Sequence, residues 1–197
     1  LTDNAGLVEV ALAAGDDAVA TDAARFLVDV LQLPSGGIAA AQDSESVIDG
    51  VRTEGGYYRA SDRSGLQPPA LDAKVVTGWN GHAIAALAAA GTRTDPRFLE
   101  AARWAADAVL ESNVADDGTL RRASLDEVRS AAPATLEDYG GLARGLLALA
   151  RATGEVAYAS RARALVDLCL GADGIHPPGA GDPVLVAQGM QSHAVPT

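Results

Sequence analysis

The chain has 197 residues and a mass of 20.0 kDa, with 48% hydrophobic residues but only 4% aromatic ones. Its net charge of −11 argues against nucleic acid as a partner, because a polyanion would be repelled. A single cysteine, Cys169, excludes an internal disulfide and a Cys-x-x-Cys motif. No apolar run approaches the roughly 18 residues of a membrane span and no signal peptide is visible, so we expect a cytoplasmic protein. Leu1 in place of Met indicates a piece of a longer protein.

The spacing of apolar residues predicts three pairs of helices. Asp95 followed by Pro96 is a strong start signal, and Gly15 and Gly154 end two of the helices. The helix that ends at Gly91 is so rich in Ala and Leu that it has no polar face, so we expect it to be buried on all sides. The predicted helices cover residues 3–14, 16–33, 77–91, 95–112, 135–153 and 155–170.

The second helix of each pair carries the pattern Ala-Arg-x-x-x-Asp followed by apolar residues. The pattern begins at Ala24, Ala102 and Ala162, which indicates one repeated unit. Arg and Asp four residues apart lie on one helix face and can pair at the surface. Connections are short within pairs and long between them, so the long ones emerge on one side. Helical repeats usually bind their ligands on the face that carries such insertions.

The long connections contain turn and strand signals. Residues 36–46 and 54–59 predict two short strands around a turn, forming a hairpin that lies over the loop face. An Asp-Gly turn within residues 116–122 leads to a further strand, and residues 173–178 repeat that turn after the third pair.

Four motifs taken together resemble one known family. They are Gly-Gly-x-x-x-Ala-Gln-Asp-Ser from Gly36, Leu-Asp-x-Lys-Val-x-Thr-x-Trp-Asn-Gly from Leu71, Asp-Pro-Arg-Phe-Leu-Glu-Ala-Ala from Asp95 and Leu-Glu-Asp-Tyr from Leu136. Their order resembles the bacterial relatives of spermatogenesis-associated protein 20. Those are thioredoxin-domain proteins whose C-terminal part is an (α/α)6 toroid, similar in fold to N-acylglucosamine 2-epimerase, cellobiose 2-epimerase and the six-hairpin glycosidases.

The resemblance implies an all-α fold, a partial (α/α)6 toroid of about three helical hairpins with short β-hairpins in the long loops on one face. Residues 1–197 would form a single incomplete toroid domain, with the thioredoxin-like domain absent and residues 192–197 starting a fourth inner helix. Three of six hairpins would leave apolar flanks at both ends of the arc. We therefore expect this fragment either to self-associate through the open toroid edges or to have been trimmed from a folded parent.

Several candidate site residues lie where the first helices of two pairs begin. Trp79 would stack on a sugar ring and Asn80 would bind hydroxyl groups; alternatively, Trp79 plugs the toroid and Asn80 caps its helix. Glu137, Asp138 and Tyr139 occupy the same place on the next pair. The two carboxylates would act as acid and base, with Tyr139 binding hydroxyls. Equally, Asp138 is spaced to complete a capping box.

The remaining candidates lie in the loops and further along the central helix. Asp43 would join the acid–base chemistry and Glu45 would contact the substrate, with solvated turn acids as the alternative. Lys74, the only lysine, would pair with a cavity carboxylate or lie at the surface. His82 would shuttle protons, as histidines do in epimerases of the resembling fold, or be a tolerated buried histidine.

Two functions of different classes fit this pattern. The first is a carbohydrate-processing or carbohydrate-binding toroid with epimerase-like or glycosidase-like chemistry and a small-molecule sugar as partner. The second is a non-catalytic helical scaffold that holds a protein partner, such as the thioredoxin-like domain of the parent protein. Neither His176 nor His193 has a partner at metal-ligand spacing, so we expect no metal site and no cofactor.

Overall fold

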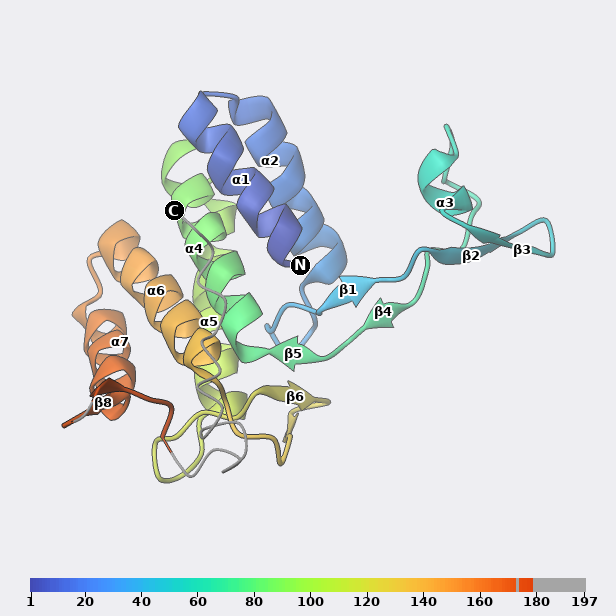
Figure 1. The fold of residues 1–197 in the computed structure, drawn as a ribbon. Helices are drawn as coiled ribbons and strands as arrows, with labels where there is room; N and C mark the ends of the chain where they lie inside the picture. The colour runs from blue at the N-terminus through green and yellow to red at the C-terminus, as the bar shows by residue number, and fades with distance from the viewer. Residues whose placement is uncertain (173, 179–197) are drawn as a thin grey trace.

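The computed structural model describes residues 1–172 and 174–178, and within them it confirms the three predicted helical pairs (Figure 1). The predictions for His193 and residues 192–197 lie outside the described residues. The first pair continues through a π-helical turn, η1, which ends before Pro34. The helices are α1 (Thr2–Ala14), α2 (Asp17–Phe26), η1 (Leu27–Leu31), α4 (Thr77–Arg93), α5 (Arg97–Asn113), α6 (Leu136–Thr153) and α7 (Val156–Leu168).

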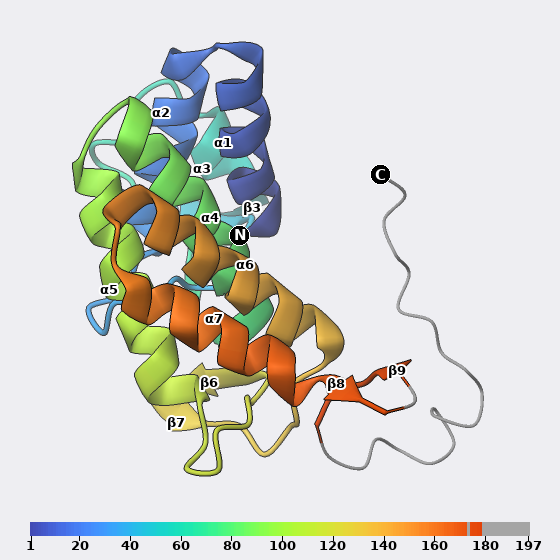
Figure 2. The same cartoon turned by 90° about the vertical axis from the view of Figure 1, so that its left-hand side faces the viewer.

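The helices of the three pairs form two layers (Figures 1 and 2). The first helices, α1, α4 and α6, pack side by side, with α4 in the middle. The second helices, α2, α5 and α7, pack mainly on their own partners. Because the first helices approach one another more closely than the second ones do, the layers curve and the first helices lie on the inner side. The all-α arc of hairpins expected for part of a toroid is therefore confirmed.

Local sequence signals determine where these helices begin and end. Asp16 caps α2, because its Oδ1 accepts a hydrogen bond from an amide in the first turn. Thr135 and Asp138 form the capping box at the start of α6. Gly15 and Gly154 close α1 and α6 in the left-handed conformation, with φ of 81° and 78°. Short-range chemistry thus sets the tight turns that join the two helices of a pair.

The central inner helix α4 is buried over most of its surface, and α6 approaches it until the two backbones touch. A Cβ atom added to Gly81 would lie 2.2 Å from the carbonyl oxygen of Gly141, and one added to Gly145 would lie 2.4 Å from that of Gly81. Gly78 packs against the start of α6 in the same contact. Only residues without a Cβ atom allow this spacing. We call Gly78, Gly81, Gly141 and Gly145 the glycine seam.

Short strands occupy the long loops, and β6 follows the Asp-Gly turn predicted within residues 116–122. The pairs β1–β4, β2–β3 and β8–β9 are two-stranded, whereas β5, β6 and β7 form a three-stranded sheet. The strands are β1 (Ala41–Gln42), β2 (Glu45–Ile48), β3 (Val51–Glu54), β4 (Leu71–Asp72), β5 (Val75–Val76), β6 (Ala123–Leu125), β7 (Val128–Arg129), β8 (Leu170–Gly171) and β9 (Gly174–Ile175).

The first loop hairpin differs from its prediction in both register and position. The sequence pattern predicts strands within 36–46 and 54–59, but the strands that pair are β2 and β3, and residues Gly56–Arg59 form the short helix α3. Asp49 and Gly50 both have positive φ, 52° and 78°, which suits a tight two-residue hairpin turn. Figure 1 shows this arm, residues 43–70, projecting away from the helices instead of lying over their loop face.

The repeated acids of the outer helices bind mainly to the next hairpin. Only the last repeat, in α7, forms the predicted internal pair of Arg and Asp. Asp29 in η1 pairs with Arg97 of α5 at 3.1 Å, and Asp107 in α5 accepts a hydrogen bond from the hydroxyl of Tyr158 in α7 at 3.0 Å. Burial and this bond to Asp107 raise the pKa of Tyr158 to about 12. The acids of the repeat therefore bind to the next hairpin in two cases and form a surface pair within the same helix in one.

Candidate functional site

Asn80 lies in the first turn of α4, and its side chain is fully buried. Its Oδ1 accepts a hydrogen bond from the amide of Ile38 at 2.8 Å, and its Nδ2 donates to the carbonyls of Ile38 and Val76, both at 3.0 Å. These bonds satisfy the buried amide and hold the loop after η1 against the start of α4. The geometry favours a positioning role for Asn80, and its contact with a sugar stays a prediction.

Asp138 joins the starts of the inner helices α4 and α6 and is 1% exposed. Its Oδ1 accepts a hydrogen bond from the amide of Gly78 at 3.1 Å, and its Oδ2 accepts from the amide of Thr135 and from Nη1 of Arg122, both at 2.8 Å. Glu137, by contrast, is exposed, with its carboxylate 4.0 Å from Arg122. Of the predicted acid–base pair, Glu137 is therefore the member open to a ligand.

Trp79 and Tyr139, the two aromatic residues predicted to contact a sugar, differ in their access to solvent. Tyr139 is buried, whereas Trp79 is partly buried. The Tyr139 hydroxyl accepts a hydrogen bond from the amide of Leu120 at 2.8 Å, and burial raises the pKa of this phenol. Tyr139 thereby anchors the loop after α5. The indole of Trp79 keeps solvent-accessible surface at the start of α4, as stacking on a sugar ring requires.

Asp43, Glu45 and Lys74 lie in the loops at the base of the arm and are exposed. Glu45 pairs with Arg52 across the β2–β3 hairpin, and Nζ of Lys74 lies 3.1 Å from the carboxylate of Asp72. In the described part of the chain, no hydrogen bond or ion pair links these three residues to the acids of α6. Lys74 is thus a surface lysine paired with a loop acid.

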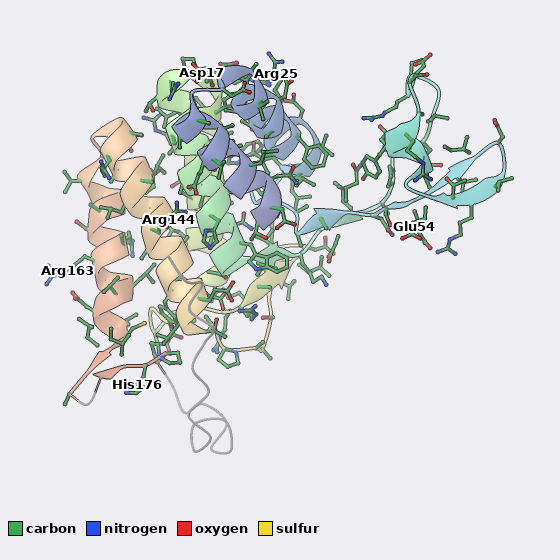
Figure 3. All side chains as sticks on the ribbon, turned by 45° about the horizontal axis from the view of Figure 1, so that its top comes forward. Asp17, Arg25, Glu54, Arg144, Arg163 and His176 are labelled. Atoms are coloured by element: carbon green, nitrogen blue, oxygen red, sulfur yellow. The ribbon has the colours of Figure 1, made fainter. Side chains whose placement is uncertain are left out.

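A charged cluster on the inner layer joins all three inner helices. Arg144 on α6 donates from Nη2 to Oε1 of Glu9 on α1 at 2.5 Å, and its Nη1 lies 3.4 Å from Nδ1 of His82 on α4. Figure 3 shows Arg144 on the side of α6 that faces these helices. Because a guanidinium only donates, a hydrogen bond between these atoms requires Nδ1 of His82 as the acceptor, and the ring N–H is then at Nε2. We call Glu9, His82 and Arg144 the inner-face cluster.

The inner-face cluster is open to a ligand from the concave side. The side chains of Glu9 and Arg144 are 34% and 47% exposed, and His82 is partly buried. Of its three members, only His82 is a candidate from the sequence. The local signal for Arg144 is its position two helical turns after Glu137 in α6, a helix that also carries Asp138 and Arg151. Its partner Glu9 lies 135 residues away in the chain, and no local pattern connects them.

A pocket of about 560 Å3 lies between the loop after η1, the end of α5 and the β6–β7 turn. Within the residues that the structure describes, no group of three or more His, Cys, Asp or Glu side chains could hold a metal ion. No helix in the same ranges is long and apolar enough to span a membrane.

Comparison with known proteins places the fold. No protein-family model and no curated protein matches the sequence. D-mannose isomerase matches with a TM-score of 0.60 and 16% identity. Cellobiose 2-epimerases from Bacillus thermoamylovorans B4167 and Spirochaeta thermophila DSM 6192 both match with a TM-score of 0.62, at 12% and 17% identity.

These matches cover 85% of this chain in each case but only 40%, 42% and 41% of the three solved chains. The chain therefore spans about two fifths of the length of the structures that it matches. At such low identity the likeness shows the fold alone, which is that of the α/α toroids of sugar epimerases and isomerases.

Proposed function

We propose that this chain is part of a carbohydrate-processing α/α toroid whose inner wall binds a sugar and assists proton transfer next to its carbonyl carbon. The observation that carries this proposal is the inner-face cluster, in which Glu9, His82 and Arg144 converge from three inner helices. Proteins of similar fold include a mannose isomerase and cellobiose 2-epimerases, so the proposed reaction is an epimerase-like or isomerase-like one.

The proposed chemistry assigns each charged group a step. Removal of the proton next to a sugar carbonyl leaves negative charge on the carbonyl oxygen, and positioned donors stabilise such charge. In this proposal Nε2–H of His82 and the guanidinium of Arg144 supply those donors, while Glu9 orients Arg144. The exposed carboxylate of Glu137 is the proposed base, and Trp79 is the proposed stacking platform for the ring.

Solvent exchange tests this proposal. D-mannose and cellobiose are incubated with the protein in D2O, and deuterium at C2 is followed by proton NMR while calorimetry measures binding. We expect His82→Gln to lose exchange by at least a hundredfold and to keep most of the binding, as for loss of a positioned catalytic group. Lys74→Gln, a change at an exposed loop residue, is the matched control. Absence of binding across a sugar panel by the unaltered protein contradicts the proposal.

The arm supports a second candidate, a scaffold for a protein partner. Val47 and Val51 in the β2–β3 hairpin are 59% and 62% exposed, on an element that projects from the helices (Figure 1). The thioredoxin-like domain implied by the family resemblance is the proposed partner. Capture of such a domain that is lost in Val47→Lys and kept in His82→Gln favours the scaffold, whereas no capture by the unaltered chain counts against it.

A further inference from the structure

Two loops of the fold have the same turn at the same place, directly after an outer helix. In segments 32–38 and 114–120 the first and last residues form an isolated antiparallel bridge. In both, the amide of the second residue donates to the carbonyl of the sixth, and the amide of the fifth donates to the carbonyl of the second. The fifth residues, Gly36 and Gly118, have φ of 98° and 82°. The two turns are therefore equivalent parts of the repeat.

The first turn is covered by an indole from the next outer helix. Trp104 of α5 lies over Gly36, so closely that a Cβ atom there would be 2.6 Å from both Cδ1 and Nε1 of the indole. The Ala-Arg-x-x-x-Asp repeat aligns Trp104 with Ala164 of α7. At the second turn, the place of the large aromatic side chain is therefore taken by a methyl group.

A groove lies where the repeat predicts the missing indole. Its volume is about 490 Å3, and it lies between α5, α7 and the loop that follows α5, all visible in Figure 2. A Cβ atom added to Gly118 would meet no other atom within 4 Å, in contrast to one added to Gly36. Its floor and apolar walls are formed by Gly118, Ala164, Leu110, Val114, Leu165 and Leu168. We call it the α5–α7 groove.

The charges at the rim of the α5–α7 groove favour an anionic ligand. Asp117 accepts hydrogen bonds from the amide and hydroxyl of Thr119, and Asp167 is paired with Arg163. Asp167 is thus paired with a cation, and Oδ1 of Asp117 is hydrogen-bonded within its own turn. Arg161, which also lines the groove, has no hydrogen bond or ion pair to any residue that the structure describes. Its guanidinium is available to a carboxylate, which it binds well in two-point geometry.

We propose that the α5–α7 groove binds a planar aromatic ring of indole size that carries a carboxylate. The ring takes the place that Trp104 occupies in the preceding repeat, over Gly118 and beside Ala164. The carboxylate extends to Arg161 at the rim. This site lies on the outer layer, on different helices from the inner-face cluster, and it does not depend on the sugar chemistry proposed above.

Two-dimensional NMR of the intact chain with indole-3-acetate, indole and tryptamine as probes tests the proposal. We expect saturable binding of indole-3-acetate at millimolar concentrations, with shifts concentrated at Leu110, Gly118 and Leu168. Indole should bind more weakly, and tryptamine most weakly, because its ammonium group meets Arg161. Arg161→Gln should reduce indole-3-acetate affinity about fivefold and leave indole unchanged, since one exposed charge pair is involved.

Filling the groove from inside provides the decisive variant. Ala164→Trp restores the residue of the preceding repeat, so binding of every probe should be lost and the Tm should rise by about 2–4 °C. The matched control is Val166→Trp, an exposed position on the same helix that does not line the groove; it should bind the probes normally and gain no stability. Absence of saturable binding, shifts away from the groove, or unchanged binding in Ala164→Trp would each overturn the proposal.

Discussion

Replacing Gly81 by alanine perturbs the closest contact between the inner helices α4 and α6. The new Cβ atom would lie 2.2 Å from the carbonyl oxygen and 2.3 Å from the carbonyl carbon of Gly141. Both are backbone atoms, so no side chain can rotate away to make room. The helices must separate by about 1 Å to restore ordinary van der Waals distances, and the packing around them must follow.

The expected cost follows from two opposing terms. Overpacking a tight core costs about 1–3 kcal/mol, and a clash with backbone belongs at the upper end of that range. Alanine regains about 1 kcal/mol of helix propensity over glycine. The net loss for Gly81→Ala is therefore about 2 kcal/mol, which corresponds to a Tm lower by about 4–8 °C in a protein of this size.

Gly140→Ala is the matched control for this experiment. Gly140 lies in α6 next to Gly141, and a Cβ atom there would meet nothing within 4 Å. Only the propensity gain applies, so we expect it to stabilise the protein by about 0.5–1 kcal/mol. Thermal melts and urea titrations of both variants give the comparison. A Gly81→Ala protein that melts at or above the wild-type temperature would refute the backbone contact as the determinant of helix spacing.

Further variants test buried polar groups and the edges of the arc. Asp138→Asn should lower the free energy of unfolding by about 3 kcal/mol in urea titrations, because it removes the charge that Arg122 and the helix ends bind; an unchanged value would contradict those contacts. Tyr158 has a folded pKa raised to about 12, so its neutral form stabilises the fold fully below about pH 10 and that contribution is lost as pH rises toward 12. Stability measured against pH should decline more steeply between about pH 10 and 12 in the wild type than in Tyr158→Phe, and parallel curves would exclude the shift. Val10 and Leu147, on the two end helices of the inner layer, are 67% and 50% exposed. Light scattering should show self-association that is reduced when both become Gln, whereas a wild-type monomer at all concentrations would rule out the open-edge contact.

Helix positions follow from the sequence because their signals are short-range. The cap at Asp16, the capping box at Thr135 and the turn at Gly154 each lie within four residues of the groups that they bind. The same reasoning locates the tight turns and therefore the order of hairpins. It fails for the arm, because the pattern around Asp49 sets a turn but contains no information on where the hairpin points.

The candidate site was harder to predict because its contacts are long-range. Arg144 and Glu9 are 135 residues apart, and each is unremarkable within its own helix. Asn80 and Asp138 have the right chemistry to bind a sugar, yet their hydrogen-bonding groups are used by loop backbone and helix ends. The first amides of a helix have no hydrogen-bond partner within the helix, and nearby polar side chains can bind them. A polar motif at the start of a buried helix therefore indicates structural anchoring as readily as ligand binding.

The glycine seam connects this packing to the proposed chemistry. Gly81 directly precedes His82, and Gly145 directly follows Arg144, so the residues that bring the two backbones together are the chain neighbours of the two side chains that meet. A separation of about 1 Å would break the contact between Nη1 of Arg144 and Nδ1 of His82, which is already long at 3.4 Å. Gly81→Ala should therefore weaken sugar binding and proton exchange although it removes no group that touches a ligand. Gly140→Ala, which leaves the helix spacing unchanged, should alter neither, and the contrast between the two separates positioning from chemistry.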